Sequence, residues 1–283
     1  MGYRSRKSFA VAGGMAVFGL IPSATIQGQE VDEPAGIPES RVSGVIGGDI
    51  YSHFVSYGLD VWAEGDAFSG SDTFNPYAEV SIDFDILSVT LGAWADVNDN
   101  VESGIGGDLQ EVDIYAGVGF GVDKFSFGLV YQEWIFGSQT EDIFDISIGY
   151  DDTGLIADDF ALSPSVVIHN RVSGDGLEEG TVIVFGIEPG FSLVDNESYT
   201  VDMSVPVSLG WVLDDDYFIA GGDDGLGFIS VGAAFGMPLD MIPADYGAWA
   251  LNAGVTLFIT EEDVYNNPED TFLVYNLGLS LAF

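Results

Sequence analysis

Apolar and polar residues alternate along most of the chain after residue 40. Residues 76–84 show the pattern clearly: every second position is apolar, and the positions between them hold Tyr77, Glu79, Ser81 and Asp83. The same two-residue period recurs in residues 87–96 and 111–122, and no stretch has a convincing helical period. A two-residue period is typical of β-strands that have one apolar face. The chain is therefore expected to be all-β.

About twelve such segments follow one another, each close to the 9 to 11 residues that a tilted strand needs to cross a bilayer. Long and short intervals between them tend to alternate, although residues 151–159 are longer than the pattern requires. Up-and-down transmembrane barrels have short turns at one end and longer loops at the other. We therefore predict an antiparallel up-and-down transmembrane β-barrel. The expected strands are residues 41–55, 75–84, 87–97, 110–122, 125–134, 142–150, 160–171, 181–193, 198–213, 226–239, 247–259 and 272–283.

The polar face of these strands distinguishes a membrane barrel from a soluble sandwich, which also shows alternation. The bulky apolar face carries almost no charge from strand to strand, whereas the other face holds Gly, Ser, Asn, Asp and Glu. An apolar outer face and a polar inner face are typical of a transmembrane barrel.

Composition supports this separation of surfaces. The 283 residues include 46 Asp and Glu against 6 Lys and Arg, a formal net charge of −40. So few basic residues exclude nucleic-acid binding by phosphate neutralisation. A hydrophobic content of 47% and a mean hydropathy of +0.27 exclude intrinsic disorder. The absence of cysteine excludes disulfides, thiolate metal sites and cysteine nucleophiles.

The first 28 residues have the features of a secretory signal peptide. Arg4, Arg6 and Lys7 precede an uncharged, mostly apolar run over residues 8–22, which is short for a spanning helix. Residues 29–40 then form an expected flexible lead-in, and residues 41–283 form the barrel. After cleavage, three basic residues remain against all 46 acidic ones.

The alternation also predicts which polar residues face the lumen. Carboxylates dominate this set, so we expect a negative lumen that concentrates cations and repels anions. An alternative is that these groups only solvate a filled interior. The predicted pore-lining residues are Asp49, Glu79, Asp83, Asp96, Glu111, Asp113, Asp145, His169, Arg171, Glu188 and Asp202.

The last strand resembles the closing strand of bacterial outer-membrane β-barrels. There, a terminal aromatic residue with apolar residues at alternate positions is the signal for the barrel-assembly machinery. Residues 47–58 (GGDIYSHFVSYG) and 111–117 (EVDIYAG) also resemble strands of the TorF-type porins, although Tyr57 stands where that family usually has Arg. This resemblance implies a porin-like role without a known substrate. The expected insertion signal consists of Tyr275, Leu277, Leu279, Leu281 and Phe283.

Two further sequence features are candidate chemical sites: a His-Asn-Arg sequence and several acidic runs. The sequence His169-Asn170-Arg171 does not fit a hydrolase, because alternation places Asn170 on the opposite face from His169. Acidic runs in the long intervals, such as residues 214–216 and 261–263, could hold Ca²⁺ or Mg²⁺ through oxygen ligands. However, residues 96–107 fail the EF-hand pattern, because Val101 stands where Gly is needed.

The sequence thus predicts a non-enzymatic outer-membrane porin for passive diffusion of small solutes, with a preference for cations. Its expected partners are outer-membrane lipid, the barrel-assembly machinery and small solutes or cations, and no nucleic acid or cofactor is expected. The alternative is a non-conducting structural or adhesive barrel whose acidic loops bind divalent ions. The transported solute and the oligomeric state are left open.

Overall fold

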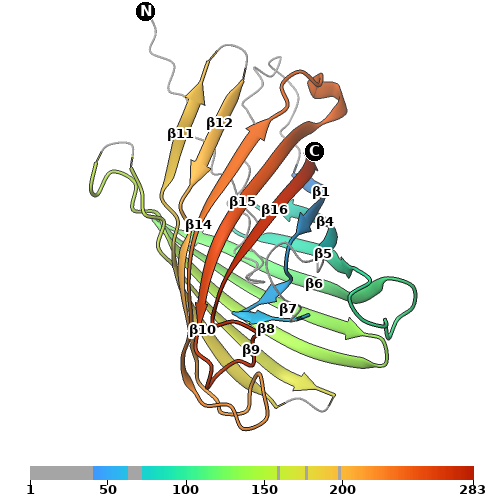
Figure 1. The fold of residues 1–283 in the computed structure, drawn as a ribbon. Helices are drawn as coiled ribbons and strands as arrows, with labels where there is room; N and C mark the ends of the chain where they lie inside the picture. The colour runs from blue at the N-terminus through green and yellow to red at the C-terminus, as the bar shows by residue number, and fades with distance from the viewer. Residues whose placement is uncertain (1–40, 63–71, 158–159, 176–177, 197–198) are drawn as a thin grey trace, which may run out of the picture.

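The computed structural model describes residues 41–62, 72–157, 160–175, 178–196 and 199–283. They form a closed, twelve-stranded antiparallel β-barrel (Figure 1), which confirms the predicted fold class. The predicted signal peptide and lead-in lie outside the described residues. The strands are β1 (Val42–Tyr51), β4 (Thr73–Asp83), β5 (Ser88–Val97), β6 (Leu109–Val122), β7 (Phe125–Phe136), β8 (Gln139–Tyr150), β9 (Ser165–Gly174), β10 (Gly180–Ile187), β11 (Gly190–Asp195), β12 (Thr200–Ser204), β13 (Val207–Val212), β14 (Gly225–Pro238), β15 (Ala248–Thr260) and β16 (Thr271–Ala282).

Strand pairing closes the barrel without a gap between its first and last strands. β1 pairs with both β4 and β16, and β16 continues to β15 and then to β14. Two barrel strands are each broken by a proline: Pro189 separates β10 from β11, and Pro206 separates β12 from β13. Proline has no backbone N–H to donate to a neighbouring strand, so it interrupts the hydrogen-bond ladder at these points. Each broken pair corresponds to one of the twelve expected strands.

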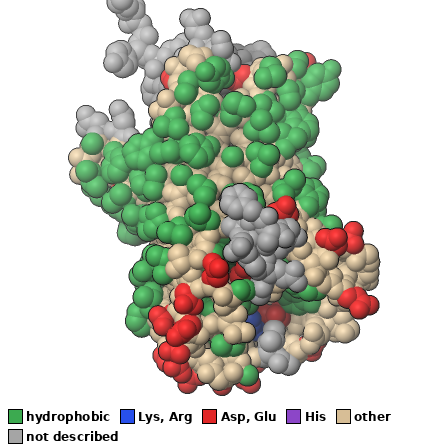
Figure 2. Space-filling view, viewed as in Figure 1, with side chains coloured by type: hydrophobic (Ala, Val, Ile, Leu, Met, Phe, Trp, Pro, Cys, Tyr) green, Lys and Arg blue, Asp and Glu red, His purple; other side chains and the backbone are tan. Residues whose placement is uncertain are grey.

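The outer surface of the barrel is apolar, as the alternation predicts. Ile50, Leu91 and Val118 point outward and are 52%, 59% and 41% exposed. Figure 2 shows hydrophobic side chains covering the flank of the barrel, with acidic side chains gathered mainly toward one end. So much exposed apolar surface would be unfavourable in water and matches the lipid-facing band of a transmembrane barrel. No helix within the described residues is long and apolar enough to span a membrane.

The two ends of the barrel differ. β1 begins and β16 ends at one of them, where the amide of Gly44 donates to the carbonyl of Phe283 (2.9 Å). We call this the proximal end and the opposite one the distal end. Proximal turns such as 84–87 and 123–124 are short, but the turn at 137–138 is also short although it is distal. The proximal connection 151–164 is long, which agrees with the exception seen in the sequence.

The connection after β1 folds back into the barrel, which the sequence did not predict. β1 ends at Tyr51, four residues before the expected end of the first strand. Residues 52–62, here called the inserted hairpin, contain the short strands β2 (Val55–Ser56) and β3 (Leu59–Asp60). Tyr57 and Gly58 form the turn between them with positive φ values of 48° and 94°. Phe54, Val55 and Tyr57 are at most 2% exposed, so the hairpin lies inside the barrel rather than outside it (Figure 1).

A hydrophobic core surrounds the inserted hairpin in the distal half of the barrel. Its members include Val55 and Tyr57 of the hairpin, Tyr217 and Tyr265 of the distal loops, and inward side chains of the wall. The expectation of a polar inner face is therefore wrong for this part of the barrel. The inward apolar side chains of the wall are Ile143, Val167, Val182, Val184, Val212, Phe228, Phe258, Phe272 and Val274.

Candidate functional site in the barrel lumen

The inserted hairpin crosses the lumen and is attached to the barrel at several points. On one side, Trp62 donates from Nε1 to Asp96 of β5 (2.7 Å), and Phe54 packs against Trp94 of the same strand. On the other, the distal loop between β15 and β16 holds the turn of the hairpin. Its Asn267 donates from Nδ2 to the carbonyl of Gly58 (2.9 Å). These contacts fix the hairpin to β5 and to the β15–β16 loop.

Further hydrogen bonds reinforce this attachment. Tyr265 donates from its hydroxyl to the carbonyl of Tyr57 (2.6 Å), and the amide of Asp60 donates to Oδ1 of Asn267 (2.9 Å). Within the hairpin, Nδ1 of His53 lies 2.9 Å from Oδ2 of Asp60, and both side chains are buried. The hairpin therefore has few unsatisfied polar groups despite its burial, as a buried segment requires.

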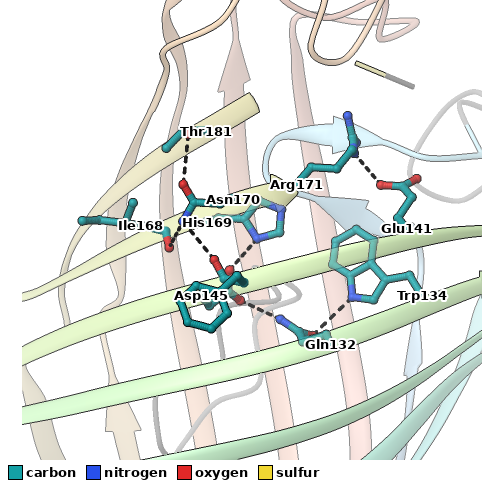
Figure 3. A network of polar contacts seen from close by, with 10 residues as sticks. Gln132, Trp134, Glu141, Asp145, Ile168, His169, Asn170, Arg171 and Thr181 are labelled. Carbon is teal, nitrogen blue, oxygen red and sulfur yellow. Dashed lines mark hydrogen bonds and ion pairs between the residues drawn. The ribbon is translucent and has the colours of Figure 1, made fainter. Parts of the chain in front are cut away.

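The carboxylate of Asp145 on β8 is the centre of a buried polar network in the wall (Figure 3). His169 of β9 donates from Nδ1 to Oδ1 of Asp145 (2.7 Å), and Gln132 of β7 donates from Nε2 to Oδ2 (2.6 Å). Trp134 donates in turn to Oε1 of Gln132 (3.3 Å). Because Asp145 is only 2% exposed, these donors replace the water that its charge would otherwise need.

Tyr57 connects this network to the inserted hairpin. Its ring stacks on the imidazole of His169, with centroids 3.8 Å apart, and its hydroxyl hydrogen-bonds to Asp145. Burial, followed by the nearby charge of Asp145, raises the pKa of the Tyr57 hydroxyl well above its usual value. The phenol is therefore a neutral donor, and Asp145 accepts hydrogen bonds from both the wall and the hairpin.

A buried ion pair lies next to this network. Nε of Arg171 donates to Oε2 of Glu141 (2.5 Å), and Nη1 donates to the carbonyls of Glu178 (3.1 Å) and Tyr217 (2.9 Å). The guanidinium also lies over the ring of Tyr217, 4.2 Å from its centroid. Arg171 thus joins two strands of the wall to two distal connections. Its guanidinium interacts with a carboxylate, two backbone carbonyls and an aromatic ring.

Asp96 is a second buried carboxylate with several donors. It accepts hydrogen bonds from Thr73, Asn75 (3.1 Å), Asn98 (2.9 Å) and Trp62 (2.7 Å). Because these donors come from β4, a distal loop and the inserted hairpin, Asp96 of β5 fastens the hairpin to β4 and β5.

The proximal half of the lumen has a different lining. The ring of Tyr77 lies against Gly47, and that of Tyr115 lies against Gly92, where an added Cβ would overlap the ring atoms. Glycine at these positions lets each tyrosine lie flat along the wall instead of across the lumen. The hydroxyl of Tyr115 donates to Oε2 of Glu79 (3.2 Å).

The structure places most of the predicted pore-lining residues on the inner face of the barrel, but in different surroundings. Glu79 and Glu188 are half-buried, whereas Asp83 is exposed at the proximal end of β4. Whether any of them lines a conducting pore stays a prediction. The buried members of the predicted set are Asp49, Asp96, Glu111, Asp113, Asp145, His169, Arg171 and Asp202.

Several residues of the lumen were not predicted from the sequence. Glu141 was omitted because the expected strand began at residue 142, whereas β8 begins at Gln139. His53, Tyr57 and Asp60 belong to the inserted hairpin and were assigned to the first strand and the following loop. A signal was present in β10, whose sequence GTVIVFGI is apolar on both faces and so indicates a filled interior.

The acidic distal loops use some of their carboxylates to accept backbone hydrogen bonds. Asp214 accepts from the amide of Thr181 (2.8 Å), Asp215 from that of Asp224 (3.1 Å) and Asp216 from that of Gly221 (2.5 Å). Among the described residues, no group of three or more His, Asp or Glu side chains is arranged to hold a metal ion. Binding of Ca²⁺ or Mg²⁺ by these loops stays a prediction.

The last strand has the expected orientation. Leu277, Leu279 and Phe283 are 59%, 41% and 59% exposed on the outer face, and Val274 and Ser280 are buried on the inner one. Recognition of this strand by the barrel-assembly machinery stays a prediction.

Comparison with known proteins gives similar folds at low sequence identity. The NanC porin has a TM-score of 0.45 and 12% identity, covering 84% of this chain and 98% of that chain. A bacterial polysaccharide outer membrane secretin has a TM-score of 0.42 and 12% identity, with 87% and 99% coverage. The translocator domain of the autotransporter NalP from Neisseria meningitidis has a TM-score of 0.40 and 10% identity, with 87% and 90% coverage. These are outer-membrane β-barrels.

At these values, the similarity adds nothing to what the strand pairing already establishes. No protein-family model matches the chain, and neither does any curated protein sequence. The resemblance to the TorF-type porins therefore stays a prediction.

We predict that Asp145→Ala lowers the free energy of unfolding of the refolded barrel by about 3 to 5 kcal/mol. The substitution leaves three buried donors without their acceptor. Asp142→Ala is the matched control, because Asp142 lies on the same strand, faces outward and accepts from Tyr131 and Ser173 at the surface. It should cost only about 1 to 2 kcal/mol. Urea titration of both variants in detergent measures the difference, and equal losses would contradict the central role of Asp145.

Proposed function

We propose that the protein is a porin-like outer-membrane channel for passive diffusion of small solutes, with a preference for cations and with the inserted hairpin as its constriction. The observation that carries the proposal is the charge of the inner wall. Nine carboxyl groups face inward from the barrel strands, and Arg171 is the one Lys or Arg side chain among the described residues that joins them. These carboxyls belong to Asp49, Glu79, Asp96, Glu111, Asp113, Glu141, Asp145, Glu188 and Asp202.

The location in an outer membrane is supported by the closed barrel and its apolar outer face. In a bilayer, every backbone polar group must be satisfied by the protein, and a closed barrel achieves this along most of its strands. β1 begins and β16 ends at the proximal end, as in barrels with an even number of strands. We infer that this end faces the periplasm and that the distal loops face outward.

The preference for cations rests on electrostatics. A low-dielectric wall with fixed negative charges raises the local concentration of cations and lowers that of anions. The packing of Tyr77 and Tyr115 against glycine keeps their rings close to the wall. The inserted hairpin narrows the path in the distal half, so the wild-type conductance should be small.

A second candidate is a closed structural or adhesive barrel that conducts nothing. The buried core around Val55 and Tyr57 favours it, because this core fills part of the distal lumen. The two candidates predict different conductances once the hairpin is released from the lumen.

Replacing residues 53–61 with a glycine-serine stretch of equal length should increase the single-channel conductance in planar bilayers several-fold. The replacement removes the side chains of Phe54 and Tyr57, which pack on Trp94 and His169 of the wall. A matched control replaces residues 99–107 of another distal loop with the same stretch, and its conductance should stay near that of the wild type. Silent bilayers with the wild type and with both variants would exclude the channel and support the closed barrel.

Charge reversal in the proximal half should change ion selectivity. In a salt gradient, the reversal potential of the wild type should favour cations, and Glu188→Lys should shift it toward anions because Glu188 faces the lumen. Asp142→Lys should leave the potential unchanged, since Asp142 faces outward. A shift with Asp142→Lys but none with Glu188→Lys would mean that the faces are assigned the wrong way round.

A further inference from the structure

Glu111 and Asp113 form a pair of buried carboxyl groups beneath the inserted hairpin. They lie two residues apart on β6, so both point into the lumen, and each is 2% exposed. Trp94 of β5 and Trp134 of β7 are the direct cross-strand neighbours of Asp113. Phe54 of the hairpin packs on Trp94, so the hairpin lies next to this site.

This pair lacks the donors that its neighbours have. Asp96 has four side-chain donors, Asp145 has the network described above, and Glu141 is paired with Arg171. Glu111 and Asp113 instead hydrogen-bond to one another, and Oδ1 of Asp113 is buried without any hydrogen-bond partner. A buried carboxylate oxygen with no donor is costly, and a bound cation would remove this cost.

No basic side chain in the described ranges supplies this charge. Arg41 pairs with Asp85 at the proximal end (3.0 Å), Lys124 donates to the carbonyl of Thr153 (3.4 Å), and Arg171 is engaged by Glu141. Asp96 and Glu141 lie close enough to add their own negative potential to the pair. The electrostatic potential at the pair is therefore negative, which favours a bound cation.

We propose that Glu111 and Asp113 bind a divalent cation inside the barrel, with Ca²⁺ as the best fit. Carboxylate oxygens are hard ligands, and two carboxylates balance one divalent charge. Ca²⁺ accepts an irregular set of ligands that includes water, whereas Mg²⁺ requires near-octahedral geometry and loses its water reluctantly. The site differs from the acidic distal loops, and it does not depend on whether the barrel conducts.

Terbium luminescence tests this site directly, because Tb³⁺ replaces Ca²⁺ and is excited by a nearby tryptophan. Excitation of tryptophan in the detergent-solubilised full-length barrel should give a saturable Tb³⁺ signal that Ca²⁺ displaces. The E111Q/D113N double variant keeps the shape of both side chains and should weaken binding at least tenfold. D240N/D245N, which neutralises the same number of exposed carboxyls in the proximal connection between β14 and β15, should bind as the wild type does.

Isothermal titration with Ca²⁺ of the wild type and of Trp94→Phe gives a second readout. The Trp94→Phe variant should lose part of the Tb³⁺ signal and keep its Ca²⁺ affinity. If the double variant does not fold, Asp113→Asn alone carries the test. Absence of saturable binding in the wild type would show that a shared proton satisfies the pair and would overturn the proposal. An unchanged signal in E111Q/D113N, or its loss in D240N/D245N, would also overturn it.

Discussion

The buried carboxylate of Asp145 is the interaction on which the distal half of the barrel depends. A charge at 2% exposure is tolerated only where donors replace water, and here the donors come from three places. His169 and Gln132 belong to the neighbouring strands, whereas Tyr57 belongs to the inserted hairpin. One carboxylate therefore fixes both the wall and the segment that crosses the lumen. The apolar core around Tyr57 then excludes water from the network, which strengthens each of its hydrogen bonds.

The strands and their faces could be predicted from the sequence, because a two-residue period over this length indicates a β-strand with one apolar face. The three segments with the clearest alternation, around Glu79, Asp96 and Asp113, have their apolar side chains outside the barrel and their polar side chains inside it. The breaks at Pro189 and Pro206 did not change the number of barrel strands. The predicted strand bounds were less accurate. One expected strand began at residue 142, whereas β8 begins at Gln139, so Glu141, the partner of Arg171, was missed.

The inserted hairpin could not be predicted in the same way. In the sequence, residues 56–74 have the length and polarity of an ordinary distal loop. No local sequence feature indicates that residues 56–62 turn into the lumen. Its position depends on long-range contacts, such as that between Gly58 and Asn267, which alternation does not encode. The apolar inner face of β10 was the available signal, since an inward Val182 or Val184 in a membrane barrel needs an apolar partner inside it. That partner is the hairpin together with Tyr217 and Tyr265.

The position of the hairpin inside the lumen can be tested at a single residue, because the chain has no cysteine. Ser56→Cys places a small thiol in the middle of the hairpin, where Ser56 is 8% exposed. In the reconstituted barrel, this thiol should resist a membrane-impermeant maleimide, whereas Ser138→Cys in the exposed distal turn should react rapidly. Equal reaction rates at the two positions would show that the hairpin lies outside the lumen and would contradict the account.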